Sequence, residues 1–337
     1  MRLQILGHGL AGAVLAEQAS AAGHTLSVMD HGPPAASRVA AGLYTPVTGK
    51  RLTPTWALEE ALHAMRRFYR NLEQQLGLTC LHERPTLRIF TSPGQRQEAL
   101  NRPLPDGIFP AADADIPHGV RAPDGAVWIT GGGWLDIPPL LDALEARRKA
   151  RGEWGPLPHP DLTLHATGFS AATHPLWQEA GWRNAYGDVL TVAIPGLAES
   201  AILSFDRFLL PLGAGSFRLG ATYFWEIDSP APRPRGRDEL MAELQARVTL
   251  PLTLTEHRAG IRPVALARVP ILGPHPDNPE HWIFNGFGSK AVLQAPWLAE
   301  RLLQHWADGT PLPRETLAPR RIQRQRDRNR HSNPVKA

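Results

Sequence analysis

The sequence has little of what several large protein classes require. It contains one cysteine, Cys80, in 337 residues. A single cysteine excludes a disulfide framework, a CxxC zinc site and an iron–sulfur cluster held by cysteines. No uncharged apolar run reaches the roughly 18 residues of a membrane span, so we expect no transmembrane helix. The GxSxG elbow of serine hydrolases is also missing.

Metal-ligating residue types occur without the spacing that metal sites use. Asp113, Asp115 and His118 lie in a proline-rich loop, and a second loop contains four more candidates, His275, Asp277, Glu280 and His281. Neither set has a fixed ligand spacing, so we interpret both as solvated loops and predict no metal site.

The net charge of +4 is unevenly distributed along the chain. Residues 314–337 contain seven arginines and one lysine against Glu315 and Asp327, a net +6, which leaves −2 for residues 1–313. A basic composition of this kind is typical of a disordered tail, and we expect residues 314–337 to be one. The charge therefore gives only weak support to a nucleic-acid partner. The rest of the composition, with 42% hydrophobic and 20% charged residues, is that of a globular protein large enough for two domains.

The first thirty residues predict a strand, a turn, a helix and a second strand. Residues 3–6 are an apolar strand, residues 7–12 a GxGxxG turn, residues 13–22 an alanine-rich helix, and residues 25–29 a strand that ends at Asp30. His8 and Glu17 interrupt the apolar run, which argues against a secretory signal. We therefore expect a cytoplasmic protein.

This turn has the chemistry of a dinucleotide site. Gly7 permits the tight turn, Gly9 lets the backbone approach a pyrophosphate, and Gly12 lets the helix pack closely on the strand. The helix N-terminus offers free N–H groups to phosphates. Asp30 stands where an acidic side chain binds ribose hydroxyls, and its charge disfavours the 2′-phosphate of NADP.

The next segment favours FAD. Residues 36–42 contain a serine, a run of small residues and a glycine, and lead into residues 43–51. Here the sequence resembles the D-amino acid oxidase family of FAD-dependent oxidoreductases, which includes glycine oxidase and sarcosine oxidase. Further matching segments follow in the family's order, over about residues 1–310: 133–136, 164–168, 186–190, 209–222, 259–263, 270–273 and 285–291.

The resemblance implies an α/β fold. It comprises a Rossmann-like FAD-binding domain of the glutathione-reductase type and an α+β substrate domain built on an antiparallel sheet. We expect the first in residues 1–60, 131–183 and 264–313, and the second in residues 61–130 and 184–263. Only residues 151–161 separate the helix over 138–150 from the Ala-Thr-Gly strand, so the part beside the adenine is shortened. Apolar patterns further predict helices over 55–76 and 238–250.

The resemblance also implies which residues bind FAD. Ser37, Arg38, Ala41 and Gly42 would lie along the pyrophosphate and reach the flavin ring. Thr167 and Gly168 would lie beside the cofactor. A glycine-rich turn opens the last matched helix, whose N-terminus can stabilise negative charge on reduced flavin; its residues are Gly286, Phe287, Gly288, Ser289 and Lys290.

Four side chains are candidates for the reacting centre. The resemblance implies that Arg262, in a Gly-Ile-Arg-Pro segment, binds a substrate carboxylate, although an arginine there could instead be structural. Lys50 and Arg51 follow the segment that reaches the flavin, where a cation could activate oxygen or simply be solvated. Tyr223, close to Trp225, matches a substrate-cage position or packs in the core.

These features predict an FAD-dependent enzyme that oxidises a C–N bond of a small amine or amino acid. Hydride would pass to flavin N5, with oxygen or another electron acceptor completing the cycle. Two alternatives stay open. The same chemistry could act on a modified tRNA base, as the basic tail suggests, or the chain could be a nicotinamide-dependent dehydrogenase, because GxGxxG turns are shared between these folds.

Overall fold

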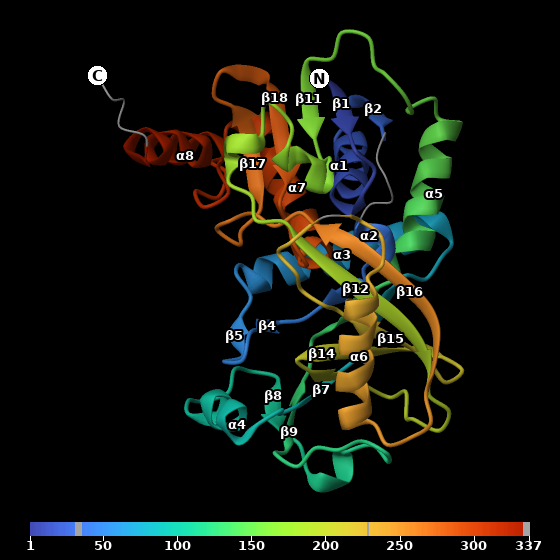
Figure 1. The fold of residues 1–337 in the computed structure, drawn as a ribbon. Coiled ribbons are helices and arrows are strands. Elements are labelled where there is room, and N and C mark those ends of the chain that lie inside the picture. The colour runs from blue at the N-terminus through green and yellow to red at the C-terminus, as the bar shows by residue number, and fades with distance from the viewer. Residues whose placement is uncertain (31–35, 228, 333–337) are drawn as a thin grey trace.

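The computed structural model describes residues 1–30, 36–227 and 229–332, which form two large β-sheets, two small ones and the helices around them. The five-stranded sheet lies in the upper part of Figure 1 and the eight-stranded sheet in the lower part. Within the described residues, no helix is long and apolar enough to cross a membrane.

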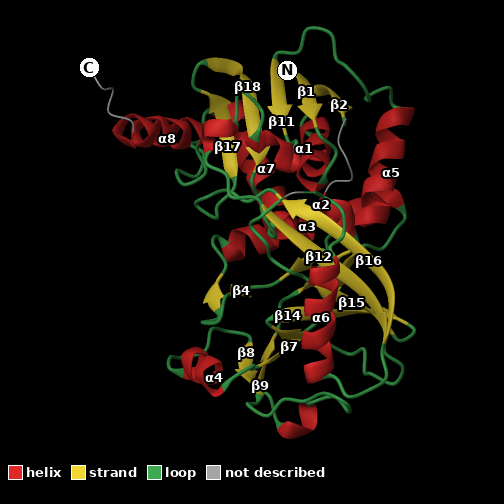
Figure 2. Cartoon of the chain, in the orientation of Figure 1, coloured by secondary structure: helices red, strands yellow, loops and turns green. Residues whose placement is uncertain are grey.

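The five-stranded sheet has the order β17-β18-β11-β1-β2. β1 pairs in parallel with β2 and β11, β11 pairs in parallel with β18, and β17 is antiparallel to β18. Helices α1 and α7 pack on each other beside the sheet, as Figure 2 shows. The elements are β1 (Arg2–Leu6), α1 (Leu10–Ala21), β2 (Thr25–Met29), β11 (Leu162–His165), β17 (Ile271–His275), β18 (Asn278–Asn285) and α7 (Ala291–Asp308).

The eight-stranded sheet is antiparallel except where β13 pairs in parallel with β7. Helix α6 (Pro234–Arg247) packs on it with Leu240 and Leu244 buried. The strands of this sheet all come from residues 61–130 and 184–263. In spatial order they are β16 (Thr253–Arg262), β12 (Ala185–Ala193), β15 (Ser216–Gly220), β14 (Arg207–Gly213), β13 (Ile202–Phe205), β7 (Thr86–Ile89), β9 (Ala126–Ile129) and β8 (Ile108–Pro110). The division into two domains stays a prediction.

The remaining elements connect these sheets. β3 (Leu43–Tyr44), β10 (Gly133–Leu135) and β6 (Leu81–Glu83) form a small antiparallel sheet, and β4 (Val47–Thr48) pairs with β5 (Thr53–Pro54). The long helix α3 (Leu58–Leu76) begins at Leu58 rather than at Thr55, because Ala57 before it has a left-handed backbone with φ +51°. The other helices are α2 (Ala36–Val39), α4 (Pro93–Leu100) and α5 (Ile137–Ala150).

The short segment between α5 and β11 runs along the outer side of β2. The Val28 amide donates to the Glu153 carbonyl at 2.9 Å, and the Gly155 amide donates to the Val28 carbonyl at 2.8 Å. Trp154 thus forms an isolated parallel bridge with Val28, and its ring meets the His8 ring edge to face at 5.0 Å. The shortened segment consequently packs against the glycine-rich turn.

The C-terminal segment departs from the expected disorder. Residues 318–332 form helix α8 (Ala318–Ser332), with Ala318 and Ile322 buried in an apolar cluster. Arg326 forms ion pairs of 2.8 Å with Glu179 and 2.7 Å with Asp277. Composition alone suggested a solvated tail, but these two carboxylates, distant in sequence, fix the helix to the body. Residues 333–337 lie outside the described part of the chain.

Candidate flavin site

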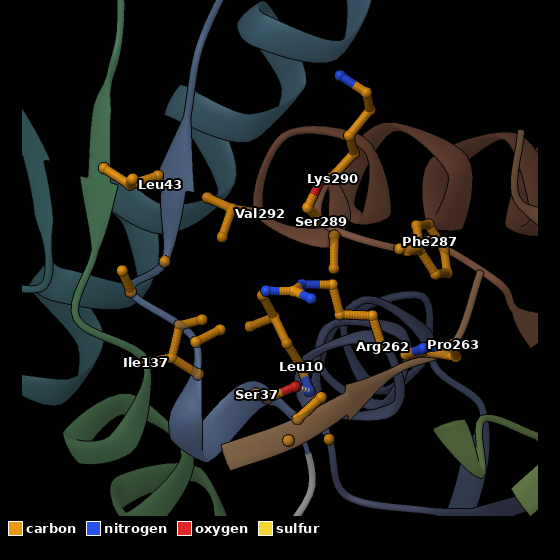
Figure 3. Close-up of a pocket in the computed structure, with 18 of the residues that line it drawn as sticks. Leu10, Ser37, Leu43, Ile137, Arg262, Pro263, Phe287, Ser289, Lys290 and Val292 are labelled. Atoms are coloured by element: carbon orange, nitrogen blue, oxygen red, sulfur yellow. Dashed lines mark hydrogen bonds between the residues drawn. The ribbon is translucent and has the colours of Figure 1, made fainter. Parts of the chain in front are cut away.

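A cavity of about 720 Å³ lies between the two sheets. Leu6, Met29 and Ala166 line it from the carboxyl ends of β1, β2 and β11, while Val189 and Phe208 line it from the eight-stranded sheet. Ligands of parallel α/β sheets bind at these strand ends. In Figure 3 the side chain of Arg262 extends among the labelled lining residues.

The glycine-rich turn closely fits a pyrophosphate at one end of this cavity. Gly7 has φ +102°, and a Cβ there would lie 2.5 Å from the Ala166 carbonyl oxygen. A Cβ on Gly12 would overlap the Gly7 carbonyl, so both positions require glycine. Gly9 lines the cavity and precedes α1 without a side-chain cap, so N–H groups of the first helical turn other than that of Leu10 are offered to a phosphate.

The predicted residues after β2 separate into two groups. Asp30, Ser37, Ala41 and Gly42 line the cavity. The Ser37 hydroxyl accepts a hydrogen bond of 3.0 Å from the Leu10 amide, which holds this segment against the start of α1. Arg38 instead pairs with Asp142 at 2.6 Å and with Glu145 on α5, and it is absent from the cavity lining.

Thr167 and Gly168 line the cavity directly after β11, next to the Gly7 turn. The Thr167 hydroxyl oxygen is buried and has no hydrogen-bond partner within the described residues. An unsatisfied buried hydroxyl is costly unless a ligand or water binds it. This atom and the tightly packed glycines therefore fit a bound dinucleotide.

The turn between β18 and α7 contributes Phe287, Gly288, Ser289 and Lys290 to the cavity, whereas Gly286 lines a second, smaller cavity next to it. The Lys290 ammonium group lies 3.5 Å from the Thr55 hydroxyl, and burial lowers the pKa of Lys290 to about 8. In Figure 3 the Lys290 side chain points away from Arg262. Its charge and the N-terminus of α7 both favour negative charge at this end of the cavity.

Arg262 is a partly buried cation with no carboxylate partner among the described residues. It stands at the end of β16, where its Nη1 donates to the Thr222 carbonyl at 3.2 Å. A Cβ on Gly187, on the neighbouring strand β12, would collide with the guanidinium, so glycine is required for this close approach. Burial lowers the pKa of Arg262 from its ordinary value, yet the group remains a cation at neutral pH.

The segment that holds Arg262 is itself held by Asp188. Asp188 is fully buried, and its Oδ2 accepts a hydrogen bond of 3.0 Å from the Thr222 hydroxyl. Its Oδ1 accepts one of 2.8 Å from the Tyr186 hydroxyl and lies 2.9 Å from Nε2 of His257. Burial is the larger cause, and the hydrogen bond to Asp188 the next, of a raised pKa of Tyr186. The phenol therefore keeps its proton and donates it in the hydrogen bond. Sequence reasoning missed Asp188.

Arg88 is another residue that the sequence analysis missed. It lines the cavity from β7, and burial lowers its pKa from the ordinary value. The alternation of apolar and polar residues along β7 could have indicated it. Leu87 and Ile89 are buried on one face of the strand, while Thr86 and Arg88 line the cavity from the other. Tyr44 also lines the cavity, and burial raises its pKa to about 12.

Lys50 and Arg51 do not line the cavity, although Thr48 and Gly49 before them do. Arg51 is exposed and pairs with Glu98 at 2.8 Å. The direction of the turn between β4 and β5 takes both side chains outward, so this placement does not support a role for them at the flavin.

Tyr223 lies in the second cavity, of about 270 Å³, which we call the outer compartment. Its lining also includes Trp225 and Arg268, and it shares Arg262 and the turn residues 287–290 with the main cavity. The Tyr223 and Trp225 rings meet edge to face at 4.8 Å, and both residues are exposed, by 44% and 42%. Neither is core.

A glycine-rich turn, two helix N-termini at one cavity, and a large, mostly antiparallel sheet beside that cavity define the class of dinucleotide-dependent oxidoreductases. The family described as "DAO: FAD dependent oxidoreductase" matches residues 2–153 and 159–305. The chain belongs to this family and is an FAD-dependent enzyme, which confirms the predicted family, fold class and cofactor and removes the nicotinamide-dependent alternative.

Among curated proteins, the chain is 24% identical to the tRNA 5-methylaminomethyl-2-thiouridine biosynthesis bifunctional protein MnmC of Marinobacter nauticus. The match covers 88% of this chain and 54% of that protein, so the chain spans about half the length of this relative.

Two solved structures share the fold. Glycine oxidase from Geobacillus kaustophilus has a TM-score of 0.73 at 17% identity, with 90% of this chain and 94% of that chain covered. Iminodiacetate oxidase from Chelativorans sp. BNC1 has a TM-score of 0.68 at 21% identity, with 92% and 96% covered.

Proposed function

We propose that this enzyme oxidises a C–N bond in a small amine or amino acid that carries a carboxylate. Arg262 is the observation that carries the proposal, because it is a cation at the FAD cavity without a carboxylate partner among the described residues. A guanidinium binds a carboxylate through two parallel hydrogen bonds. The family's solved neighbours, an oxidase of glycine and one of iminodiacetate, act on substrates of this kind.

The residues around Arg262 orient such a substrate. FAD supplies a hydride acceptor at N5 when bound. Arg262 would fix the carboxylate, and the hydrogen bond to the Thr222 carbonyl limits the movement of the guanidinium. Apolar side chains such as Leu43, Val189 and Phe208 line the same cavity and exclude water. Their low polarity favours the neutral form of the substrate amine, whose lone pair hydride loss requires.

Anaerobic mixing tests this proposal. The FAD-loaded protein is mixed with a panel of glycine, sarcosine, iminodiacetate and larger amino acids, and the loss of oxidised flavin absorbance is followed. At least one carboxylate-bearing amine should bleach the flavin, while matched amines without a carboxylate should not. Bleaching by none of the panel would refute the proposal. Readmission of oxygen, with detection of peroxide, tells whether oxygen or another acceptor completes the cycle.

A second candidate is the same oxidation on a modified base of tRNA. The similarity to the tRNA-modifying relative supports it, and so do the exposed rings of Tyr223 and Trp225 beside the flavin cavity. A ring-bearing substrate too large for the main cavity could rest in the outer compartment. Incubation with tRNA carrying an aminoalkyl-modified uridine, followed by nucleoside mass spectrometry, tests this function. An unchanged nucleoside would exclude it.

A further inference from the structure

We propose that α8 and the outer compartment form one RNA-binding surface. The arginines of α8 would contact backbone phosphates, and the aromatic rings of the outer compartment would stack on an unpaired base. This inference rests on the second proposed function, the oxidation of a modified tRNA base, and assigns the surface by which such a substrate is held.

Helix α8 presents a row of cations on the face that points away from the body. Arg320 and Arg324 are four residues apart and therefore follow one another along a single face. Arg320 and Arg324 are exposed, and neither pairs with a carboxylate in the part of the chain that the structure describes. The buried face, with Ala318 and Ile322, holds the row in a fixed orientation.

Two other arginines of α8, Arg321 and Arg326, anchor the helix to the body. Arg326 is held by Glu179 and Asp277. The Arg321 guanidinium donates to the carbonyls of Val269 at 2.8 Å and Pro270 at 3.0 Å. Because the helix is fixed by these contacts, its exposed arginines need little further ordering when they meet a polyanion.

The anchor also joins α8 to the outer compartment. The carbonyls that Arg321 binds belong to the residues directly after Arg268, and Arg268 lines the outer compartment. The start of α8 lies beside β17 in Figure 1, and the loop before β17 carries Arg268. A strand of RNA could therefore contact α8 and the mouth of the flavin cavity together.

The outer compartment has the composition of a stacking site. The Arg183 guanidinium lies 3.9 Å from the centre of the Trp225 ring, and the Arg235 guanidinium lies 5.2 Å from the centre of the Phe224 ring. Exposed aromatic rings with arginines around them are typical of proteins that bind single-stranded nucleic acid. Glu226 follows Trp225, but these cations outnumber it. An acidic protein would be attracted to α8 without any need for exposed rings, so RNA is the better match.

Fluorescence anisotropy of a labelled RNA hairpin with an unpaired loop tests the surface. The FAD-loaded, full-length protein is titrated at several salt concentrations. R320E/R324E should weaken binding at least about tenfold and reduce the slope of log K against log salt by about 1.4, the value for two lost phosphate contacts on a single strand. Trp225→Ala should weaken binding by about tenfold with the slope unchanged, because stacking releases no counterions.

The matched control is R96E/R121E, which makes the same change in net charge at two exposed arginines, on α4 and in the loop before β9. It should bind as the wild type does. Equal losses in both charge-reversed pairs, or no binding by the wild type at low salt, would overturn the surface. Retained FAD shows that each variant is folded.

The two proposals can fail separately. If the wild type converts a tRNA nucleoside while R320E/R324E binds the hairpin as tightly as the wild type, the tRNA function stands and the surface on α8 falls. If hairpin binding depends on α8 while no tRNA nucleoside changes, the surface stands and the tRNA function falls.

Discussion

Thr222 links Arg262 to Asp188: its carbonyl oxygen accepts a hydrogen bond of 3.2 Å from the Arg262 guanidinium, and its hydroxyl donates one of 3.0 Å to the Asp188 carboxylate. Arg262, one of the cations that line the flavin cavity, is thereby connected to the fully buried Asp188 without contacting it. This arrangement holds Arg262 in place but leaves its charge available to a substrate.

Arg262→Met should raise KM for a carboxylate substrate by about ten- to a hundredfold, because a charge-assisted hydrogen-bonded pair contributes about 1.5–3 kcal/mol. FAD should stay bound. Steady-state kinetics and the flavin content of the purified variant measure both effects. Arg258→Met is the control, since Arg258 lies on the same strand, is exposed and pairs with Glu256. A KM equal to that of the wild type would mean that Arg262 is structural.

Asp188→Asn should raise KM through Arg262, by about fivefold to tenfold, while kcat changes little. The variant should also lose about 2 kcal/mol of stability, because the buried carboxylate accepts several hydrogen bonds that an amide satisfies less well. Kinetics and urea unfolding measure the two effects. Asp238→Asn, at an exposed residue of α6, should change neither. A loss of stability without a change in KM would show that the network does not position Arg262.

Gly187→Ala should impair substrate binding by displacing Arg262. The added Cβ would collide with the guanidinium and would lie 2.6 Å from the Thr222 carbonyl oxygen. Forcing an extra carbon into a packed site typically costs about 1–3 kcal/mol. The double variant with Arg262→Ala should recover part of that stability, because one collision is removed. Gly94→Ala on α4, where the added Cβ would meet only the Ser92 hydroxyl at 4.0 Å, should not lower stability. Equal melting temperatures for Gly187→Ala and Gly94→Ala would contradict this geometry.

Lys290 should make stability depend on alkaline pH. Burial lowers its pKa to about 8 in the folded chain, against 10.5 for an exposed lysine. Between these values the unfolded chain binds more protons, so stability rises with pH. The gain from this group should not exceed about 3 kcal/mol. The FAD-free Lys290→Met variant should lack this rise in stability with pH. Lys149→Met, which changes an exposed lysine, should retain the rise. Parallel urea unfolding curves at pH 7 to 10.5 measure the difference, and identical pH profiles for wild type and Lys290→Met would exclude it.

Local motifs were the part of the fold that the sequence predicted well. The glycine-rich turn and its flanking strands depend on neighbouring residues, so the spacing of Gly7, Gly9 and Asp30 was enough to predict their place at the cavity. Side-chain direction in loops depends on distant packing instead. Lys50 and Arg51 follow residues that line the cavity, yet they point away from it.

Long-range partners account for the other differences. The tail was expected to be disordered because its composition is strongly basic, but Ala318 and Ile322 are four residues apart and form an apolar face. The carboxylates that bind Arg326 come from Glu179 and Asp277, which no local pattern connects with it. Asp188 was missed for the same reason, since its partners Thr222 and His257 come from other strands or loops.

The two outermost strands of the five-stranded sheet are both partly covered by other segments of the chain. Residues 153–155 hydrogen-bond to Val28 on β2, and at the other side the Leu272 amide on β17 donates to the Thr316 carbonyl at 2.8 Å. An uncovered strand edge is a template on which a second molecule can add its own strand. The shortened segment after α5 and the residues before α8 therefore hinder strand pairing between molecules, and so aggregation. This protection is independent of any part they play in binding a substrate.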